Sequence, residues 1–194
     1  TYLWGEPRDE PMQWLARSRW AVRNVIPLTP PGNIRMLDAI EQRLAQGEGS
    51  AGLTSYLRRA GIGYLVVRND LVRANDVPDP VLVHEALSES PGLTRVATFG
   101  PDVGGGGHLA GRSGERIVVN GGWQAVWPAV EVFAVAGSVE AAVSSGDPDI
   151  VVGGPEDLVD LLDLGTIDET PTRLAADVQG RPDPGARIVL TDGL

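Results

Sequence analysis

Cysteine and lysine are both absent from this sequence of 194 residues, and long hydrophobic runs are absent as well. Without cysteine the chain can form no disulfide, no thiolate metal site and no cysteine nucleophile. The longest stretch without a charged side chain, Ile117 to Val130, is interrupted by Gly121, Gly122 and Pro128. It is shorter than the roughly 20 apolar residues that a helix needs to cross a bilayer, so the sequence predicts no transmembrane helix.

Positive charge is scarce and unevenly placed. The formal net charge is -10, and all sixteen cationic residues are arginines. From Glu131 onward thirteen acidic residues stand against three arginines, whereas the stretch through Arg73 carries ten arginines and seven acids. A nucleic-acid binder needs a basic surface to contact phosphates, so the overall charge argues against that class. The acidic end is interpreted as a solvated face.

The start of the chain lacks the features of a signal peptide. It reads TYLWGEPRDEP, without a methionine and without a basic flank followed by an apolar run. We therefore expect an excised segment of a larger protein. The apolar content of 42% is sufficient for a buried core, so we expect this segment to fold as a soluble unit.

Composition and periodicity divide the chain into three parts. Residues 1–32 are rich in Trp, Arg and Pro and predict an irregular segment, with one short helix over Pro11 to Arg17. Residues 33–136 predict a helix-helix-strand unit followed by a strand-rich portion, and residues 137–194 an acidic, doubly wound portion. The predicted fold class is α/β, with a small, mostly parallel sheet at the C-terminal end.

The middle part opens with two helices and a strand. Apolar residues recur at helical spacing from Asn33 to Gln46, and a second helix over 51–60 ends at Gly61. The run YLVVR (64–68) follows immediately and predicts a buried strand, which completes an αβ unit. A third helix is predicted over Pro80 to Ser90.

Glycine interrupts the strand-rich portion that follows. A strand is predicted from Leu93 to Phe99, and the run DVGGGGHLAGRSG (102–114) has too little apolar surface to pack, so it predicts a mobile excursion. The runs ERIVVN (115–120) and AVEVFAV (129–135) predict neighbouring antiparallel strands, because the connection between them is short.

Helices and strands alternate regularly in the last part, as expected of a small doubly wound sheet. The predicted elements, in chain order, are a helix SVEAAVSS (138–145), a strand DIVVGG (149–154), a helix PEDLVDLLDLG (155–165), and the strands TRLAAD (172–177) and ARIVLTD (186–192).

Signatures of nucleotide, metal or nucleophilic chemistry are weak. The Gly-Gly turn at Gly153 matches neither GxGxxG nor GxxxxGK[ST], and two carboxylates at the following helix start would repel an anion, so it is interpreted as a tight turn. The two histidines, His84 and His108, support neither a triad nor a zinc site. Asp147 and Asp149 lack an EF-hand pattern, so we predict no metal and no cofactor.

Carboxylates and tryptophans gather in the irregular opening segment. Glu6, Asp9 and Glu10 are the candidate set for a carboxylate pair in glycoside chemistry, although a solvated acidic turn is the favoured interpretation. Three of the five tryptophans, Trp4, Trp14 and Trp20, occur here among several arginines. Flat aromatic faces suit sugar rings and guanidinium groups suit phosphates. The alternative, that these rings only anchor the segment to the core, stays open.

The stretch from Trp4 to Leu71 carries an extended similarity. It opens WGEPRDEPMQWLARSRWAVRN, ends GIGYLVVRNDL, and resembles the extracytoplasmic region of the actinobacterial arabinofuranosyltransferases of the AftD type. The later segments DPDIVVGGPEDLVDLLDLG and ARIVLTDGL resemble the same family. The similarity lies in long segments and contains no catalytic signature.

The resemblance implies a parent enzyme with many membrane helices. Such enzymes transfer arabinofuranose from decaprenyl-phosphoryl arabinose to the arabinan of arabinogalactan and lipoarabinomannan, and their catalytic acid lies in a loop that this sequence does not contain. It therefore implies a noncatalytic, substrate-guiding segment at the extracytoplasmic face of the plasma membrane. Its implied partners are the donor lipid, the arabinan acceptor and the parent's own membrane helices.

Six residues are the predicted substrate contacts. The transfer needs help for the leaving phosphate and a platform for the acceptor, and both could come from polar and aromatic side chains beside a rigid strand. The candidates lie in RWAVRN and at the end of the strand YLVVR: Trp20, Arg23, Asn24, Arg68, Asn69 and Asp70. Internal hydrogen bonds and an ion pair among them are the alternative.

Two other functions remain open from the sequence. A structural module that docks the parent's membrane helices or a cell-wall protein would expose an apolar patch around Trp4, Trp14 and Trp20. A stand-alone nucleotide-binding or hydrolytic domain would need a concave pocket lined by the Gly153 turn and one histidine.

Overall fold

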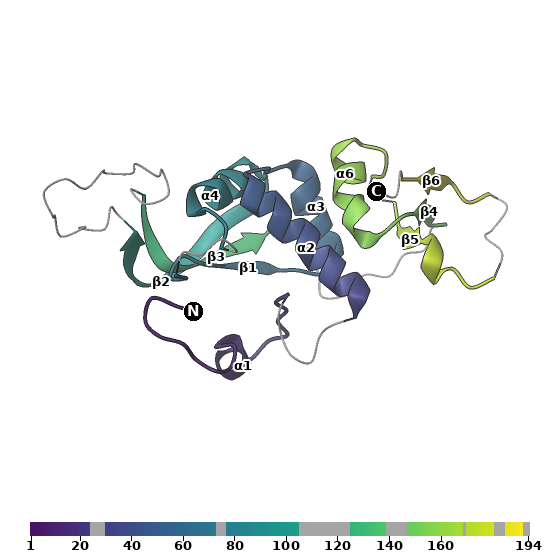
Figure 1. Cartoon of the computed structure of the whole chain (residues 1–194). Coiled ribbons are helices and arrows are strands. Elements are labelled where there is room, and N and C mark those ends of the chain that lie inside the picture. Colours follow the sequence, from purple (N-terminus) through teal and green to yellow (C-terminus); the bar gives the residue numbers. More distant parts are fainter. Residues whose placement is uncertain are drawn as a thin grey trace, which may run out of the picture.

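Two small sheets with their helices, and an irregular N-terminal segment, make up the described part of the protein. The computed structural model describes residues 1–23, 30–72, 77–104, 125–138, 147–168, 170–180 and 185–191. One sheet carries helices α2, α3 and α4 along one side, the other lies next to α6, and the N-terminal segment runs along β1 on the side away from α2 (Figure 1). None of the described helices is long and apolar enough to cross a membrane.

The first sheet is antiparallel and has its longest strands in the middle and at one edge. Its order is β1-β3-β2, with β1 Tyr64–Arg68, β2 Leu93–Gly104 and β3 Val126–Val135. From Ala129 to Val135 every second residue of β3, including Glu131 and Phe133, is buried, whereas the residues between them are only partly covered. This alternation shows that the described helices cover one face of the sheet and leave the other face to other parts of the chain or to solvent.

The three helices begin and end at residues suited to those positions. Pro31 opens α2 (Pro31–Gln46), and Gly47 ends it in the left-handed region with φ 77°. Helix α3 (Ala51–Arg59) begins at Ser50, whose hydroxyl accepts from the Leu53 amide, and α4 (Pro80–Glu89) begins at Asp79 in the same way. The predicted helices are therefore confirmed to within a few residues.

The second sheet is parallel. Its order is β5-β4-β6, with β4 Asp149–Val152, β5 Thr172–Leu174 and β6 Ile188–Leu190. A short 3-10 turn η1 (Pro155–Asp157) and helix α6 (Leu158–Asp163) follow β4. The predicted parallel pairing is confirmed. The predicted strand over 172–177 is too long, because Ala175–Asp177 turns into a second 3-10 helix η2.

A shared core joins the two sheets. The larger buried cluster contains residues of α2, α3 and β3 and also Val159 of α6, and a smaller cluster lies between the second sheet and α6. Helix α3 approaches α6 closely at Gly52, where a Cβ atom would overlap the Asp163 carboxylate, and the Gly52 amide donates to that carboxylate at 2.9 Å. The first core therefore crosses residue 136, where the sequence predicted a boundary.

Two predictions need correction, and two others lie outside the described residues. Strand β1 was predicted as buried, but the described helices cover only one face of the sheet, so Tyr64 and Val66 are exposed. Strand β2 continues past Phe99, and Asp102 to Gly104, the first three residues of the predicted mobile excursion, pair with β3 instead. The rest of that run, 105–114, lies outside the described residues. The predicted strand 115–120 and almost all of the predicted helix 138–145 lie outside the described residues.

Candidate functional site

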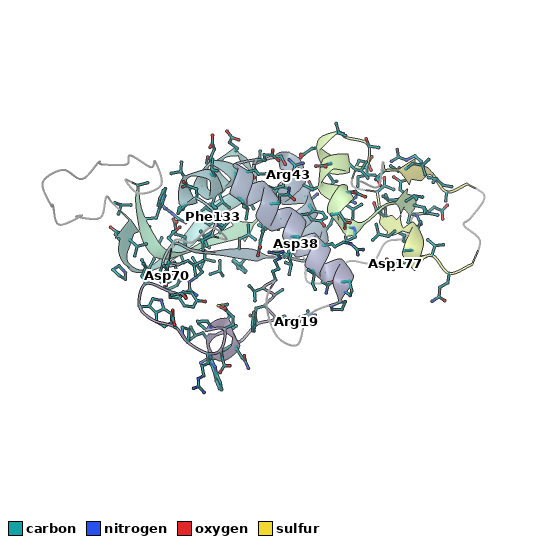
Figure 2. The ribbon with its side chains drawn as sticks, in the orientation of Figure 1. Arg19, Asp38, Arg43, Asp70, Phe133 and Asp177 are labelled. Atoms are coloured by element: carbon teal, nitrogen blue, oxygen red, sulfur yellow. The ribbon has the colours of Figure 1, made fainter. Side chains whose placement is uncertain are left out.

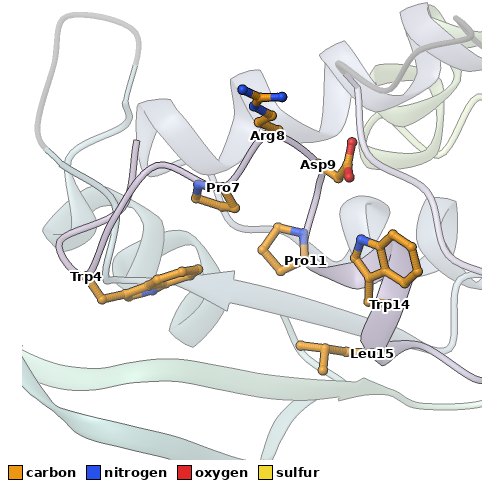
Figure 3. Close-up of a pocket in the computed structure, with 7 residues that line it drawn as sticks. All are labelled: Trp4, Pro7, Arg8, Asp9, Pro11, Trp14 and Leu15. Carbon is orange, nitrogen blue, oxygen red and sulfur yellow. The ribbon is translucent and has the colours of Figure 1, made fainter.

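A hollow of about 320 Å³ opens in the N-terminal segment. We call it the tryptophan hollow. Two tryptophans line it, Trp4 with 59% and Trp14 with 75% of its surface exposed. Trp14 belongs to the short helix α1 (Met12–Leu15). The remaining lining residues supply two prolines, one aliphatic side chain and one charge of each sign (Figure 3): Pro7, Arg8, Asp9, Pro11 and Leu15.

Trp4 is held in place by Asp70, far along the chain. The indole Nε1 of Trp4 donates to Asp70 Oδ2 at 2.6 Å, and the Leu3 amide donates to the Asp70 carbonyl at 2.7 Å. On the other side, the ring of Trp4 stacks on Tyr2 with centroids 4.9 Å apart. These contacts fix one wall of the tryptophan hollow while leaving much of the Trp4 face open to solvent.

Arg68 completes the support. Its guanidinium donates to both carboxylate oxygens of Asp70, at 3.0 and 2.9 Å, and lies over the Tyr2 ring, 4.5 Å from the centroid. Burial alone would raise the pKa of Asp70, but the hydrogen bonds from Arg68 and Trp4 outweigh it and hold the pKa below its ordinary value. Asp70 therefore stays ionised at neutral pH.

Alternation along the chain explains this geometry. Arg68 ends β1, and Arg68 and Asp70 point toward the N-terminal segment, whereas Asn69 lies on the opposite side against β3. The Asn69 amide group donates to the Pro128 carbonyl at 2.8 Å and to Glu131 Oε2 at 2.9 Å. Figure 2 shows Asp70 at the junction between the first sheet and the N-terminal segment.

The carboxylates near the tryptophan hollow do not form a catalytic pair. Of the three acids singled out in the sequence, Asp9 lines the hollow. Glu6 instead accepts from the Thr1 hydroxyl at 3.0 Å, and Glu10 accepts from the Tyr2 hydroxyl at 3.2 Å. Glycoside cleavage needs two carboxyl groups across one bond, so this arrangement suits binding better than hydrolysis. Among the described residues, no three acidic or histidine side chains converge to hold a metal ion.

The whole chain, residues 1–194, matches the family described as Alpha-(1->3)-arabinofuranosyltransferase, N-terminal GT-C domain. The chain belongs to this AftD family. It is 39% identical to the Alpha-(1->3)-arabinofuranosyltransferase of Mycolicibacterium smegmatis and 36% identical to that of Mycobacterium tuberculosis, over 99% of its own length in both cases. The chain spans 14% of the length of each of these relatives.

The fold of the chain is also that of the AftD family. The structure superimposes on a cryo-EM structure of arabinofuranosyltransferase AftD from Mycobacteria with a TM-score of 0.73 and 38% sequence identity. The match covers 99% of this chain and 15% of that one. The parentage predicted from the sequence is therefore confirmed.

The predicted contact residues of this AftD-family chain fall into three groups. Arg68 and Asp70 support the tryptophan hollow from behind, and Asn69 faces away from it. Trp20 is half-buried and does not line the hollow, and Arg23 forms an ion pair with Asp38 of α2. Asn24 lies outside the described residues.

Arg8 and Asp9 are lining residues that the predicted contact set missed. The sequence places Asp9 and several arginines beside the tryptophans, but nothing in a linear sequence shows that Arg8 and Asp9 share a hollow with Trp4 and Trp14. The prolines at positions 7 and 11 were the available signal, because they restrict the backbone of the intervening turn.

The Gly153 turn of this AftD-family chain is occupied by its own carboxylate. Asp157 Oδ2 accepts from the Gly154 amide at 2.9 Å and from the Thr191 hydroxyl at 2.8 Å. A phosphate bound to this turn would have to displace that carboxylate. The arrangement counts against the nucleotide-binding alternative and agrees with the tight turn predicted from the sequence.

Proposed function

We propose that this chain is a noncatalytic, substrate-guiding part of an arabinofuranosyltransferase. The parent would transfer arabinofuranose from decaprenyl-phosphoryl arabinose to the arabinan of arabinogalactan and lipoarabinomannan, at the extracytoplasmic face of the plasma membrane. Membership of the AftD family supports the activity of the parent. The observation that supports the guiding role is a pair of exposed tryptophans on one hollow, one of them fixed by a buried ion pair.

The tryptophan hollow is suited to a sugar chain. The faces of Trp4 and Trp14 can cover the C–H surface of a furanose ring, and the charged ends of Arg8 and Asp9 can exchange hydrogen bonds with its hydroxyls. Because the hollow is open to solvent, a polymer could lie across it without inserting a chain end. An internal part of an arabinan acceptor is therefore a better fit than the reactive end of the donor lipid.

The side chains that line the tryptophan hollow support a noncatalytic role. Glycosyl transfer needs a base within hydrogen-bond reach of the acceptor hydroxyl. Among the residues that line the hollow, Asp9 is the single carboxylate. The hollow can hold and orient an acceptor, while the reacting groups would come from elsewhere in the parent.

Titration with arabinan oligosaccharides tests this proposal. Binding to the tryptophan hollow should change the tryptophan fluorescence of the chain, and Trp14→Ala should weaken binding at least tenfold. Trp14 is largely exposed, so its removal should leave the fold intact. Phe99→Ala is the matched control, because Phe99 is an exposed aromatic residue on β2 that does not line the hollow. Equal affinities of the Trp14 variant and the wild type would refute the proposal.

A second function is favoured by the uncovered face of the first sheet. Tyr64, Val66 and Phe99 are exposed and oppose Ala134, Val132 and Val130 of β3, which places them on the face that carries no helix. The N-terminal segment covers the Arg68 end of this face through Tyr2. An exposed apolar sheet face of this kind suits docking onto the parent's own membrane helices.

Photo-crosslinking in a full-length family member distinguishes this docking role. A photoreactive residue at position 64 should form crosslinks within the same polypeptide, to segments beyond this chain. The control position is 164, because Leu164 is equally exposed but follows α6. Crosslinking at position 164 alone would exclude the sheet face as the docking surface.

A further inference from the structure

A fully buried carboxylate lies at the centre of the first sheet. Glu131, in the middle of β3, has no exposed surface. It accepts hydrogen bonds from three separate elements: Arg95 Nη1 of β2 reaches Oε1 at 2.7 Å, while His84 Nε2 of α4 and Asn69 Nδ2 after β1 reach Oε2 at 2.5 and 2.9 Å. A buried charge is tolerated only where partners of this kind surround it.

These partners keep Glu131 ionised. Burial raises the pKa of its carboxyl group, but the hydrogen bonds from His84, Arg95 and Asn69 lower it further than burial raises it, so the pKa falls below the ordinary value. His84 is itself fixed on both sides, since Nδ1 lies 2.7 Å from the Pro80 carbonyl and the ring stacks on Trp127 at 4.5 Å. Glu131 thus presents a rigid acceptor to Asn69.

Asn69 transmits this rigidity to the end of β1. Its Nδ2 uses both of its protons, one on Glu131 and one on the Pro128 carbonyl, and its backbone amide donates to the Ala129 carbonyl at 2.9 Å. The residues on either side, Arg68 and Asp70, form the ion pair that holds Trp4. The orientation of Asp70 is therefore set from the opposite face of the sheet.

We propose that Glu131 is a positioning residue for the tryptophan hollow: through Asn69 it fixes the turn from which Arg68 and Asp70 hold Trp4. Only the predicted change in affinity for arabinan rests on the proposed sugar-binding role. The position of Trp4 is a property of the free protein and can be measured without any ligand.

Glu131→Gln is the informative substitution. The glutamine keeps the shape of the side chain but turns one acceptor oxygen into a donor that faces other donors, so at least one of Arg95, His84 and Asn69 loses its partner. In either orientation of the amide, Asn69 also loses the negative charge of its acceptor, which weakens that hydrogen bond. The Trp4 indole N–H signal, assigned from its loss in Trp4→Phe, should move upfield toward the position of an exposed indole. Affinity for arabinan oligosaccharides should fall roughly three- to tenfold, the factor expected for one lost orienting hydrogen bond.

Asp149→Asn is the matched control. Asp149 is a buried carboxylate on the central strand of the second sheet, paired with Arg187 at 2.5 Å, so its loss destabilises the protein without touching the first sheet. The Trp4 signal and the affinity should remain at wild-type values in this variant. An equal change of the Trp4 signal in both variants would show a general loss of stability and would overturn the proposal.

A double-mutant cycle with Asn69→Ala decides whether Glu131 acts through Asn69. Asn69→Ala should shift the Trp4 signal as Glu131→Gln does, and the double variant should shift it no further, since both remove one path. If Glu131→Gln does not fold, Asn69→Ala alone carries the test. An unmoved Trp4 signal in Asn69→Ala would overturn the positioning role. If the wild type binds no arabinan while the variants show the expected Trp4 shifts, the sugar-binding role alone is refuted.

Discussion

Replacing Asp70 by asparagine should release the N-terminal segment from the first sheet while the sheet itself stays folded. Asp70 has 3% of its surface exposed and accepts three side-chain hydrogen bonds, two from Arg68 and one from Trp4. Oδ2 receives donors from both residues. In Asp70→Asn one oxygen becomes an amide NH₂ group, so at least one donor loses its acceptor and the Arg68 charge loses its counter-charge.

The magnitude follows from the burial of the pair. Breaking a buried, hydrogen-bonded ion pair by removing the charge of one partner costs about 3 kcal/mol. Because each 1.4 kcal/mol corresponds to a factor of ten, the open population of the segment should rise about a hundredfold. The cost falls on the local opening equilibrium, since no residue of the segment belongs to the larger buried cluster.

Hydrogen exchange measured by NMR reads this opening directly. The Trp4 indole N–H and the Leu3 amide, which donate to Asp70, should exchange about a hundredfold faster in Asp70→Asn. Exchange of the Leu57 amide, inside α3, should not change, and the exposed-site control Asp177→Asn should match the wild type throughout. Unchanged protection of Trp4, or equal acceleration at Leu57, would refute the reasoning.

Two further perturbations test the packing and the buried charge. Gly52→Ala should lower stability by about 1–3 kcal/mol because the added methyl group overlaps Asp163, whereas Gly32→Ala, with open space at its Cβ position, should be neutral or slightly stabilising in thermal unfolding. The lowered pKa of Glu131 contributes stability that is complete above its ordinary value of 4.5 and is lost as the pH falls through the folded value. Urea unfolding between about pH 3 and pH 7 should therefore show a shallower acid dependence for Glu131→Gln than for the wild type; identical slopes would contradict the buried-charge account.

Local signals in the sequence predicted the helices well. Apolar spacing from Asn33 to Gln46 and the stop at Gly61 predict α2 and α3, and a helix starting at Pro80 predicts α4, each within a few residues of the observed element. Strand pairing was less accessible. Strand β1 follows α3 as in an αβ unit, yet it pairs antiparallel with β3, more than sixty residues later. Periodicity indicates a strand but does not identify its partner.

The candidate site shows the same limit. The aromatic, arginine-rich opening segment indicates a binding surface, and the sequence also points to Arg68, Asn69 and Asp70 at the end of β1. The supporting role of Asp70 depends on its contact with Trp4, which no linear pattern contains. Glu131 could have been recognised earlier. In AVEVFAV, Glu131 stands two and four residues before Phe133 and Val135, so a strand places all three on the same buried face. A buried charge at this position implies partners.

Steady-state kinetics of a full-length family member with Trp14→Ala tests the central claim most directly. A noncatalytic, substrate-guiding hollow predicts that KM for the arabinan acceptor rises about tenfold while kcat stays close to the wild-type value, because binding is lost equally in the ground state and the transition state. An unchanged KM would show that the tryptophan hollow does not guide the acceptor. A large fall in kcat at constant KM would show that it takes part in the chemistry and would contradict the noncatalytic assignment.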